Sequence, residues 1–262
     1  MHLETLEANL FRSTALFEEP RGHGLYGGQV AAQALLAAAR TVDDDRQPHS
    51  LHSYFLSRGE SNQPVVFAVE RDRDGRSYSA RRVVARQDGR TILSLAVSFH
   101  AGEQSPDVQA DDRPDAPAPE QVLDRSLVSR CVGIDFLDLS PETPWPRRMW
   151  TRLAEQMPLD GCMPACLLTY LSDIYSGLFT FPEARAETNL ISLDHSVWFH
   201  RDPRVDDWLL MDLRGESIAN GRGMYRGSIF DRSGRLLASL AQESLFRQTD
   251  RPRRTLRVDS PT

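Results

Sequence analysis

The stretch "DGRTILSLAVSF" at residues 88–99 aligns without a gap with "SGRLLASLAQES" at residues 233–244. Each stretch opens on a glycine turn and continues as a run of alternating residues, which is typical of a strand that leaves a hairpin. The second stretch follows the first by 145 residues. A match of this length predicts that the chain holds two copies of one structural unit.

The residues before each stretch follow one plan, a helix and then several strands. In the first half, apolar residues recur at helical spacing over 26–42, and strand-like runs with Asp-Gly turns follow. In the second half, the same spacing predicts a helix over 165–179, and strand-like runs follow again. Alternation of apolar and polar residues within these runs favours antiparallel pairing.

A helix followed by a meander, twice, predicts an α+β fold of two tandem helix-plus-antiparallel-sheet units. We assign residues 1–103 to the first unit and 121–250 to the second. Residues 104–120 are rich in proline, aspartate and alanine and are predicted to be a linker. Residues 251–262 are predicted to be a disordered tail.

Composition excludes several classes of function. There are 37 acidic and 31 basic residues, every basic one an arginine, and a net charge of −6 argues against a nucleic-acid partner. The three cysteines do not form a disulfide framework or a metal-ligand pattern, so we expect a reducing, cytoplasmic location and neither metal nor cofactor. No run approaches the ~20 apolar residues of a membrane span, so stable membrane insertion is not expected.

Alignment of the two copies shows a polar residue in the second copy where the first copy has an apolar one. Gln242 aligns with Val97, on a face that the alternation predicts to be buried. Burying an unpaired amide costs about 1–3 kcal/mol, so Gln242 needs partners. It is either a residue of the sheet rim that is satisfied by backbone or part of a site.

Two further polar residues draw attention in the second unit. Asp173 flanks the apolar stripe of the helix predicted over 165–179, and is either a solvated boundary residue or functional. Ser192 begins a strand, with Asp194 and Ser196 expected on the same face. An acid, a hydroxyl and an amide that converge in a cleft can activate and orient a water molecule, which is a hydrolytic apparatus without a covalent nucleophile.

Most of residues 5–247 resembles the type II acyl-CoA thioesterases, which are double-hotdog proteins. The pieces that carry the resemblance are "FRS" at 11–13, "YGGQVAAQAL" at 26–35, "HSLHSYFLSRG" at 49–59, "DGRSYSARRV" at 74–83, "YLSD" at 170–173, "LDHSVWFHR" at 193–201, "DWLL" at 207–210, "GRG" at 221–223 and "AQES" at 241–244. The resemblance implies a double hotdog fold and hydrolysis of acyl-CoA to free fatty acid and coenzyme A. It also implies that Asp173, Ser192 and Gln242 hold and activate the attacking water. Ser192 departs from the threonine of the family pattern but keeps the hydroxyl group.

Other conspicuous residues carry weaker functional hypotheses. Gly28, at the start of the first helix, is a candidate anion site, and Arg58, Arg81 and Arg82 are candidate ligands for the phosphates of coenzyme A. Simple helix entry and solvated surface arginines are the alternatives. His195 and His200 lie beside aromatic residues, which favours a packing role for both.

Two other functions are compatible with the same fold, and the fold also favours self-association. An enoyl-CoA hydratase needs a histidine five residues after its aspartate, where this chain has Leu178. A non-catalytic acyl-CoA or lipid-binding module is the other rival. Exposed sheet edges favour a homo-oligomer.

Overall fold

The structure is a computed structural model that describes residues 1–13, 24–110, 112–123, 129–131, 133–143, 145–155, 157–184, 188–203 and 205–248. The tail predicted at 251–262 lies outside these residues. The elements of the first half are β1 (Glu4–Glu7), β2 (Leu10–Ser13), α1 (Gly27–Ala39), β3 (Arg46–Phe55), β4 (Val65–Asp74), β5 (Tyr78–Gln87) and β6 (Arg90–Ala101). Those of the second half are α2 (Pro119–Leu123), β7 (Ser129–Cys131), β8 (Ile134–Asp138), β9 (Arg148–Leu153), α3 (Met163–Ser172), the 3₁₀ helix η1 (Gly177–Thr180), β10 (Thr188–Ser192), β11 (Asp194–Phe199), β12 (Leu209–Ala219), β13 (Arg222–Phe230) and β14 (Leu236–Gln248).

The strands form one antiparallel sheet that runs through both halves. Its order is β1-β2-β4-β5-β6-β3-β11-β14-β13-β12-β9-β8-β7, and β10 also pairs with β14. The halves join where β3 pairs with β11, with Leu51 opposite Val197. This arrangement confirms the two tandem α+β units predicted from the repeat and the double hotdog fold that the resemblance implies. No helix in the described part of the chain is long and apolar enough to cross a membrane.

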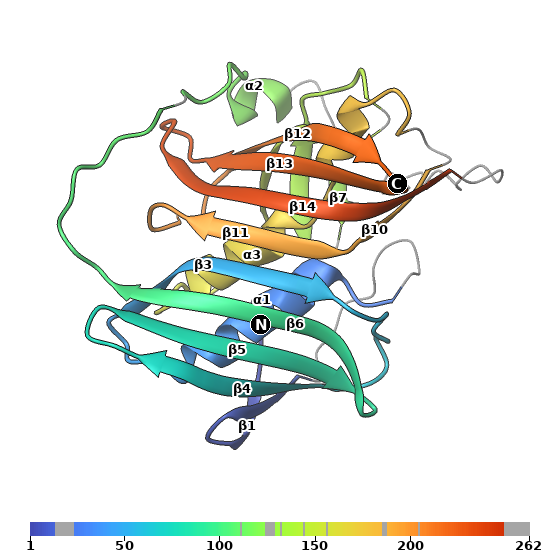
Figure 1. The fold of residues 1–262 in the computed structure, drawn as a ribbon. Helices are drawn as coiled ribbons and strands as arrows, with labels where there is room; N and C mark the ends of the chain where they lie inside the picture. The colour runs from blue at the N-terminus through green and yellow to red at the C-terminus, as the bar shows by residue number, and fades with distance from the viewer. Residues whose placement is uncertain are drawn as a thin grey trace.

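Helices α1 and α3 lie side by side behind the centre of the sheet (Figure 1). Alanine fills much of α1, and small side chains let the helices and the sheet approach closely. Gly28 is one such contact, because a Cβ atom there would lie 2.7 Å from the carbonyl oxygen of Tyr170 in α3. Helix packing therefore explains why position 28 has no side chain.

Helix α3 is shorter than predicted. It ends at Ser172, Asp173 forms its C-cap, and residues 177–180 form a separate 3₁₀ turn. The chain packs closely against β12 and β13 at Gly177, where a Cβ atom would lie 2.8 Å from the backbone nitrogen of Arg214 in β12. A helix continued to residue 179 would not allow this approach, and the periodicity of the apolar residues could not reveal it.

The described residues of the segment predicted as a linker are irregular up to α2, which begins at Pro119. Figure 1 shows it passing along one side of the molecule from β6 to α2. Polar contacts attach it to the second half, because Asp107 accepts from Arg201 and the carbonyl of Pro117 accepts from the indole of Trp150. It is thus a connector that is fixed by hydrogen bonds despite its low apolar content.

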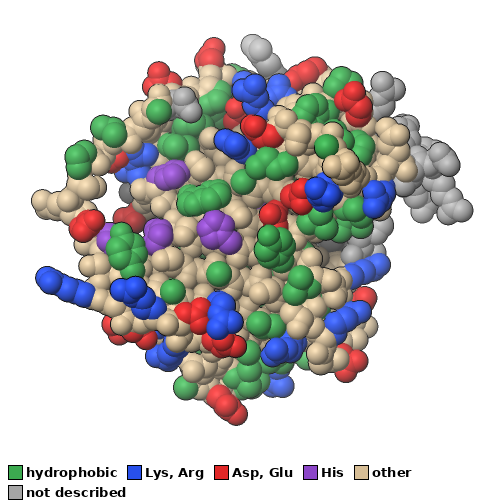
Figure 2. All heavy atoms as spheres, in the orientation of Figure 1, with side chains coloured by type: hydrophobic (Ala, Val, Ile, Leu, Met, Phe, Trp, Pro, Cys, Tyr) green, Lys and Arg blue, Asp and Glu red, His purple; other side chains and the backbone are tan. Residues whose placement is uncertain are grey.

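The inner face of the sheet packs against the helices and confirms the predicted alternation. Val97 of β6 and Gln242 of β14 are both buried there. His52, His200 and Trp198 lie on the opposite, outer face, and Figure 2 shows histidine side chains gathered among uncharged ones on this face. His195 alternates with Ser196 along β11 and faces inward, fully buried.

Candidate active site

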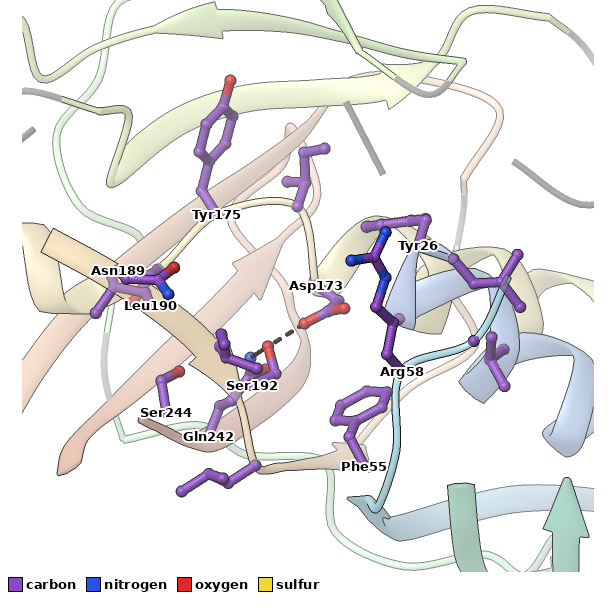
Figure 3. A pocket seen from close by; sticks show the side chains of 18 of the residues that line it. Tyr26, Phe55, Arg58, Asp173, Tyr175, Asn189, Leu190, Ser192, Gln242 and Ser244 are labelled. Carbon is purple, nitrogen blue, oxygen red and sulfur yellow. Dashed lines mark hydrogen bonds between the residues drawn. The ribbon is translucent and has the colours of Figure 1, made fainter. Parts of the chain in front are cut away.

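A cavity of about 580 Å³ opens beside the joint between the two halves. Its walls come from the start of α1, the end of β3, the segment after α3, and strands β10 and β14 (Figure 3). The first half contributes Tyr26, Gly27, Phe55 and Arg58, and the second contributes Asp173, Ser192 and Gln242. The structure therefore brings together the three residues that the sequence predicted to be catalytic.

Asp173 reaches the cavity because α3 ends one residue before it. Its Oδ1 atom accepts a hydrogen bond of 3.1 Å from Nε2 of Gln242. Its Oδ2 atom faces the first turn of α1, where a Cβ atom on Gly27 would lie only 2.7 Å away. Glycine at position 27 thus leaves space for the carboxylate, and the N-terminus of α1 lies next to it.

Gln242 is buried, and both polar atoms of its side-chain amide have hydrogen-bond partners, as the alignment of the two copies required. Its Nε2 atom donates to Oγ of Ser192 at 2.7 Å as well as to Asp173. Its Oε1 atom lies 2.5 Å from Nδ1 of His195. Because the amide has two hydrogens, both are engaged by the two other predicted catalytic residues.

Ser192 faces the cavity because the strand is interrupted after it. Strand β10 ends at Ser192 and β11 begins at Asp194, and between them Leu193 donates its N–H to the carbonyl of Glu243. The expectation that Ser192, Asp194 and Ser196 share one face is therefore wrong. Asp194 instead accepts from the backbone N–H of Glu243 on the outer side, and burial raises the pKa of this carboxyl group.

Tyr225 also lines the cavity, but its environment keeps the phenol neutral. Burial raises its pKa well above the usual range, and the charges of Asp173 and Asp194 add to the effect. Its hydroxyl donates to the carbonyl oxygen of Tyr175 at 3.2 Å. Tyr225 therefore supports the segment after α3 and is not a candidate base.

The three candidate arginines differ in where the structure places them. Arg58 lines the cavity and has a half-exposed side chain. Arg82 lies on the surface, where it pairs with Asp72. Arg81 is buried, and its guanidinium donates to Thr41, to backbone carbonyls and to Asp74. Arg81 and Arg82 lie outside the cavity lining. The predicted phosphate contacts of Arg81 are wrong, because its N–H donors are used to hold the end of α1 to the hairpin of β4 and β5.

His195 is buried in the interior, as expected of a packing residue. Its two ring nitrogens also lie within hydrogen-bond distance of Gln242 and of Ser172. His200, for which packing was also favoured, is instead exposed on the outer face of the sheet, with its ring beside Ser239. Because side chains alternate along a strand, the sequence could place His195 and His200 on opposite faces of the sheet. No pattern in the sequence indicated that His195 would contact Gln242.

The cysteines do not form a metal site. The Sγ atoms of Cys162 and Cys166 lie 3.9 Å apart as free thiols, and a hydrogen bond with Cys162 together with burial raises the pKa of Cys166. Within the described ranges, no cluster of three or more histidine, cysteine or acidic side chains is placed to hold a metal ion.

The fold and the cavity define a class, the double-hotdog thioesterases. Two family models match, the acyl-CoA thioesterase N-terminal domain over residues 18–100 and the acyl-CoA thioesterase C-terminal domain over residues 103–246. The chain belongs to this acyl-CoA thioesterase family.

Individual relatives agree over nearly the whole chain. Acyl-coenzyme A thioesterase 8 of Rattus norvegicus is 32% identical over 96% of this chain and 88% of its own length. Acyl-CoA thioesterase 2 of Haemophilus influenzae is 30% identical over 94% of this chain and 95% of its own. The crystal structure of an acyl-CoA thioesterase II from Mycobacterium marinum superposes with a TM-score of 0.80, at 36% identity, over 95% of this chain and 96% of that one.

Proposed function

We propose that this chain hydrolyses the thioester bond of acyl-CoA with Asp173 as general base, and with Ser192 and Gln242 as the groups that orient the reacting atoms. The observation that carries the proposal is the single hydrogen-bonded cluster that these three side chains form on the cavity wall. The family membership of the chain supports the reaction class.

The reaction needs one water molecule and one base. Asp173 takes a proton from the water as its oxygen attacks the thioester carbonyl carbon. The tetrahedral intermediate then collapses, the C–S bond breaks, and the proton held by Asp173 passes to the leaving thiolate. Fatty acid and coenzyme A are the products, and Asp173 is ionised again.

The number of hydrogen atoms that Gln242 and Ser192 have available to donate assigns a distinct role to each side chain. Both amide hydrogens of Gln242 are engaged, so Gln242 acts by holding Asp173 and Ser192 rather than by touching the water. Ser192 accepts from Gln242, so its own hydrogen is available to a group in the cavity. In this arrangement the Ser192 hydroxyl donates to the water or to the thioester oxygen.

The N-terminus of α1 is the proposed site for the developing oxyanion. The first backbone N–H groups of a helix have no partner within the helix, and the helix dipole favours negative charge there. Gly27 lines the cavity next to Asp173, and Gly28 follows it on the first turn. Arg58, at the same cavity, is the proposed contact for a coenzyme A phosphate.

Neither rival is favoured by the geometry. Leu178, which stands where a hydratase needs its histidine, is fully buried in η1. His195 is buried behind Gln242 and is not among the cavity-lining residues, so it does not replace the missing histidine. A binding module without chemistry has no need of an acid, a hydroxyl and an amide joined on one cavity wall.

Two broader proposals come from the chain as a whole. We propose a homo-oligomer, because the sheet ends in edge strands such as the exposed β1, which are able to pair or to be covered. We propose a cytoplasmic location, because three cysteines are too few for the disulfide framework that is common in oxidising compartments. Sedimentation as a monomer would contradict the first proposal.

The test of function is free-thiol release from acyl-CoAs of short, medium and long chain, with wild type and Asp173→Asn side by side. We expect release by wild type and a fall in kcat of at least about 10²-fold in the variant, because the general base is lost. Asp45→Asn, at an exposed acid of the first half, is the control and should leave turnover unchanged. Near-normal turnover in Asp173→Asn would remove Asp173 from the mechanism, and no release by the folded wild type would favour the binding module.

A further inference from the structure

A closed circuit of hydrogen-bonding groups lies behind the cavity wall. Ser172 Oγ lies 2.7 Å from His195 Nε2, and His195 Nδ1 lies 2.5 Å from Gln242 Oε1. Gln242 Nε2 returns to Asp173, which follows Ser172 in the chain. The end of α3 is therefore connected to β14 twice, once directly and once through His195.

Three members of the circuit are excluded from solvent, whereas Asp173 lines the cavity. Ser172 and His195 are fully buried, and Gln242 is 3% exposed. Buried polar groups that are fully paired have few alternative arrangements, because each alternative leaves a donor or an acceptor unpaired at a cost of about 1–3 kcal/mol. The orientation of each side chain therefore depends on its neighbours.

The charge of Asp173 determines where the protons lie. An ionised carboxylate only accepts hydrogen bonds, so Gln242 must direct its NH₂ group toward Asp173 and its Oε1 toward His195. Nδ1 of His195 must then carry a hydrogen. This holds whether the ring is neutral, with Ser172 donating to Nε2, or charged, with the Ser172 hydrogen directed to the carbonyl of Thr169 at 2.9 Å.

We infer that His195 is a positioning residue that holds the Gln242 amide in the one orientation that serves both Asp173 and Ser192, with Ser172 as the support for its ring. The inference rests on the proposed function, because it assigns His195 a purpose through those residues. His195 does not touch the substrate. Without its Nδ1–H donor, Oε1 of the buried amide has no partner, and one of the three contacts that fix the position of the amide is lost.

The decisive comparison is between His195→Asn and His195→Leu. Asparagine and leucine have nearly the same shape, and both remove the imidazole ring, so both create a similar cavity. Only asparagine keeps an N–H donor close to the position of Nδ1. We expect His195→Asn to keep kcat within about threefold of wild type, and His195→Leu to lower it by about 10- to 100-fold with KM little changed, since misplaced groups cost this much.

Two further variants complete the kinetic panel. Ser172→Ala removes the group that supports Nε2 and should lower kcat less than His195→Leu does. His52→Leu is the control, because His52 is an exposed histidine of β3 on the outer face of the sheet. Equal kcat values for His195→Asn and His195→Leu, with both proteins folded by near-ultraviolet circular dichroism, would overturn the inference.

A spectroscopic measurement separates this inference from the proposed function. In ¹⁵N-histidine-labelled protein, the ring nitrogens of His195, assigned from the signals lost in His195→Asn, should show a hydrogen on Nδ1. An unprotonated Nδ1 would overturn the inference even if Asp173→Asn is inactive. Full turnover by Asp173→Asn would instead overturn the proposed roles, and the ring spectrum would still decide the orientation of the amide.

Discussion

Replacing Gln242 by glutamate tests the cluster with an almost isosteric change. Nε2 of Gln242 lies 3.1 Å from Oδ1 of Asp173, so Gln242→Glu would place a second carboxylate oxygen at that distance. Two unit charges 3.1 Å apart repel by about 5 kcal/mol at an effective dielectric constant of about 20. Since one pKa unit corresponds to about 1.4 kcal/mol, the pair should keep one proton up to about 4 units above the pKa of an isolated carboxyl group. This is an upper limit on the electrostatic contribution, because water and the neighbouring donors screen the two charges.

The shared proton should appear in the pH dependence of activity. General-base catalysis needs ionised Asp173, so the acid limb of kcat/KM should move to higher pH in Gln242→Glu. At pH 7 the variant should lose most of its activity and regain part of it as the pH rises. Recovery should be incomplete, because the introduced carboxylate, once charged, accepts the Ser192 hydrogen that the substrate otherwise receives.

The assay is thiol release between pH 5 and 10, corrected for uncatalysed hydrolysis, with thermal melting at each pH to exclude unfolding. Gln47→Glu is the matched control, because Gln47 is exposed in β3 and gains the same charge away from the cluster. Its profile should coincide with that of wild type. An acid limb in Gln242→Glu that stays within about half a unit of wild type would refute the placement of Gln242 beside the catalytic base.

Three smaller changes test other parts of the site. Ser192→Thr should retain kcat, whereas Ser192→Ala should lower it by about 10- to 100-fold in the thiol assay; equal rates would show that the hydroxyl is not used. Gly27→Ala places a Cβ atom 2.7 Å from the Asp173 carboxylate, so activity should fall and Tm should drop by a few degrees; an unchanged melting curve would contradict the close approach. Asp194→Asn keeps the acceptor for the backbone of Glu243 but removes a charge that burial disfavours. The folded-state pKa of Asp194 lies above its unfolded value, so ionisation of this group costs stability at neutral pH, and the variant should melt slightly higher there. The gain should vanish as the pH falls through the raised pKa, and a gain that does not depend on pH would contradict this explanation.

The repeat predicted the fold because it constrains the structure over long distances. An offset of 145 residues places Gln242 on the same sheet face as Val97, and both side chains are buried on that face. The same comparison marked Gln242 as a polar residue that needs partners. A single copy of the unit would have shown only a glutamine in an apolar strand.

Features that depend on contacts between distant elements could not be predicted. Helical periodicity continues beyond Ser172, but the helix ends there with Asp173 as its C-cap, and the chain then packs closely against β12 at Gly177. Strand alternation continues through Leu193, but an interruption there turns Ser192 inward. Arg81 shares a strand face with the buried Val83 and Ala85, but only its partners on the hairpin and at the end of α1 explain how a guanidinium group is accommodated there.

The two halves of the chain contribute different chemical groups to one site. Where the second half has Gln242, the first half has Val97, which has no hydrogen-bonding group in its side chain. The first half instead supplies cavity wall through Tyr26, Gly27 and Phe55, and the N-terminus of α1 faces the carboxylate of Asp173. The proposed base, the hydroxyl and the amide come from one half, and the proposed oxyanion site comes from the other. The pairing of β3 with β11 fixes the distance between these parts, since Phe55 ends β3 and donates its N–H to the carbonyl of Leu193, next to Ser192. Covalent fusion therefore does more than join two folds. It keeps one complete site at the boundary between the two halves, to which each half contributes different groups.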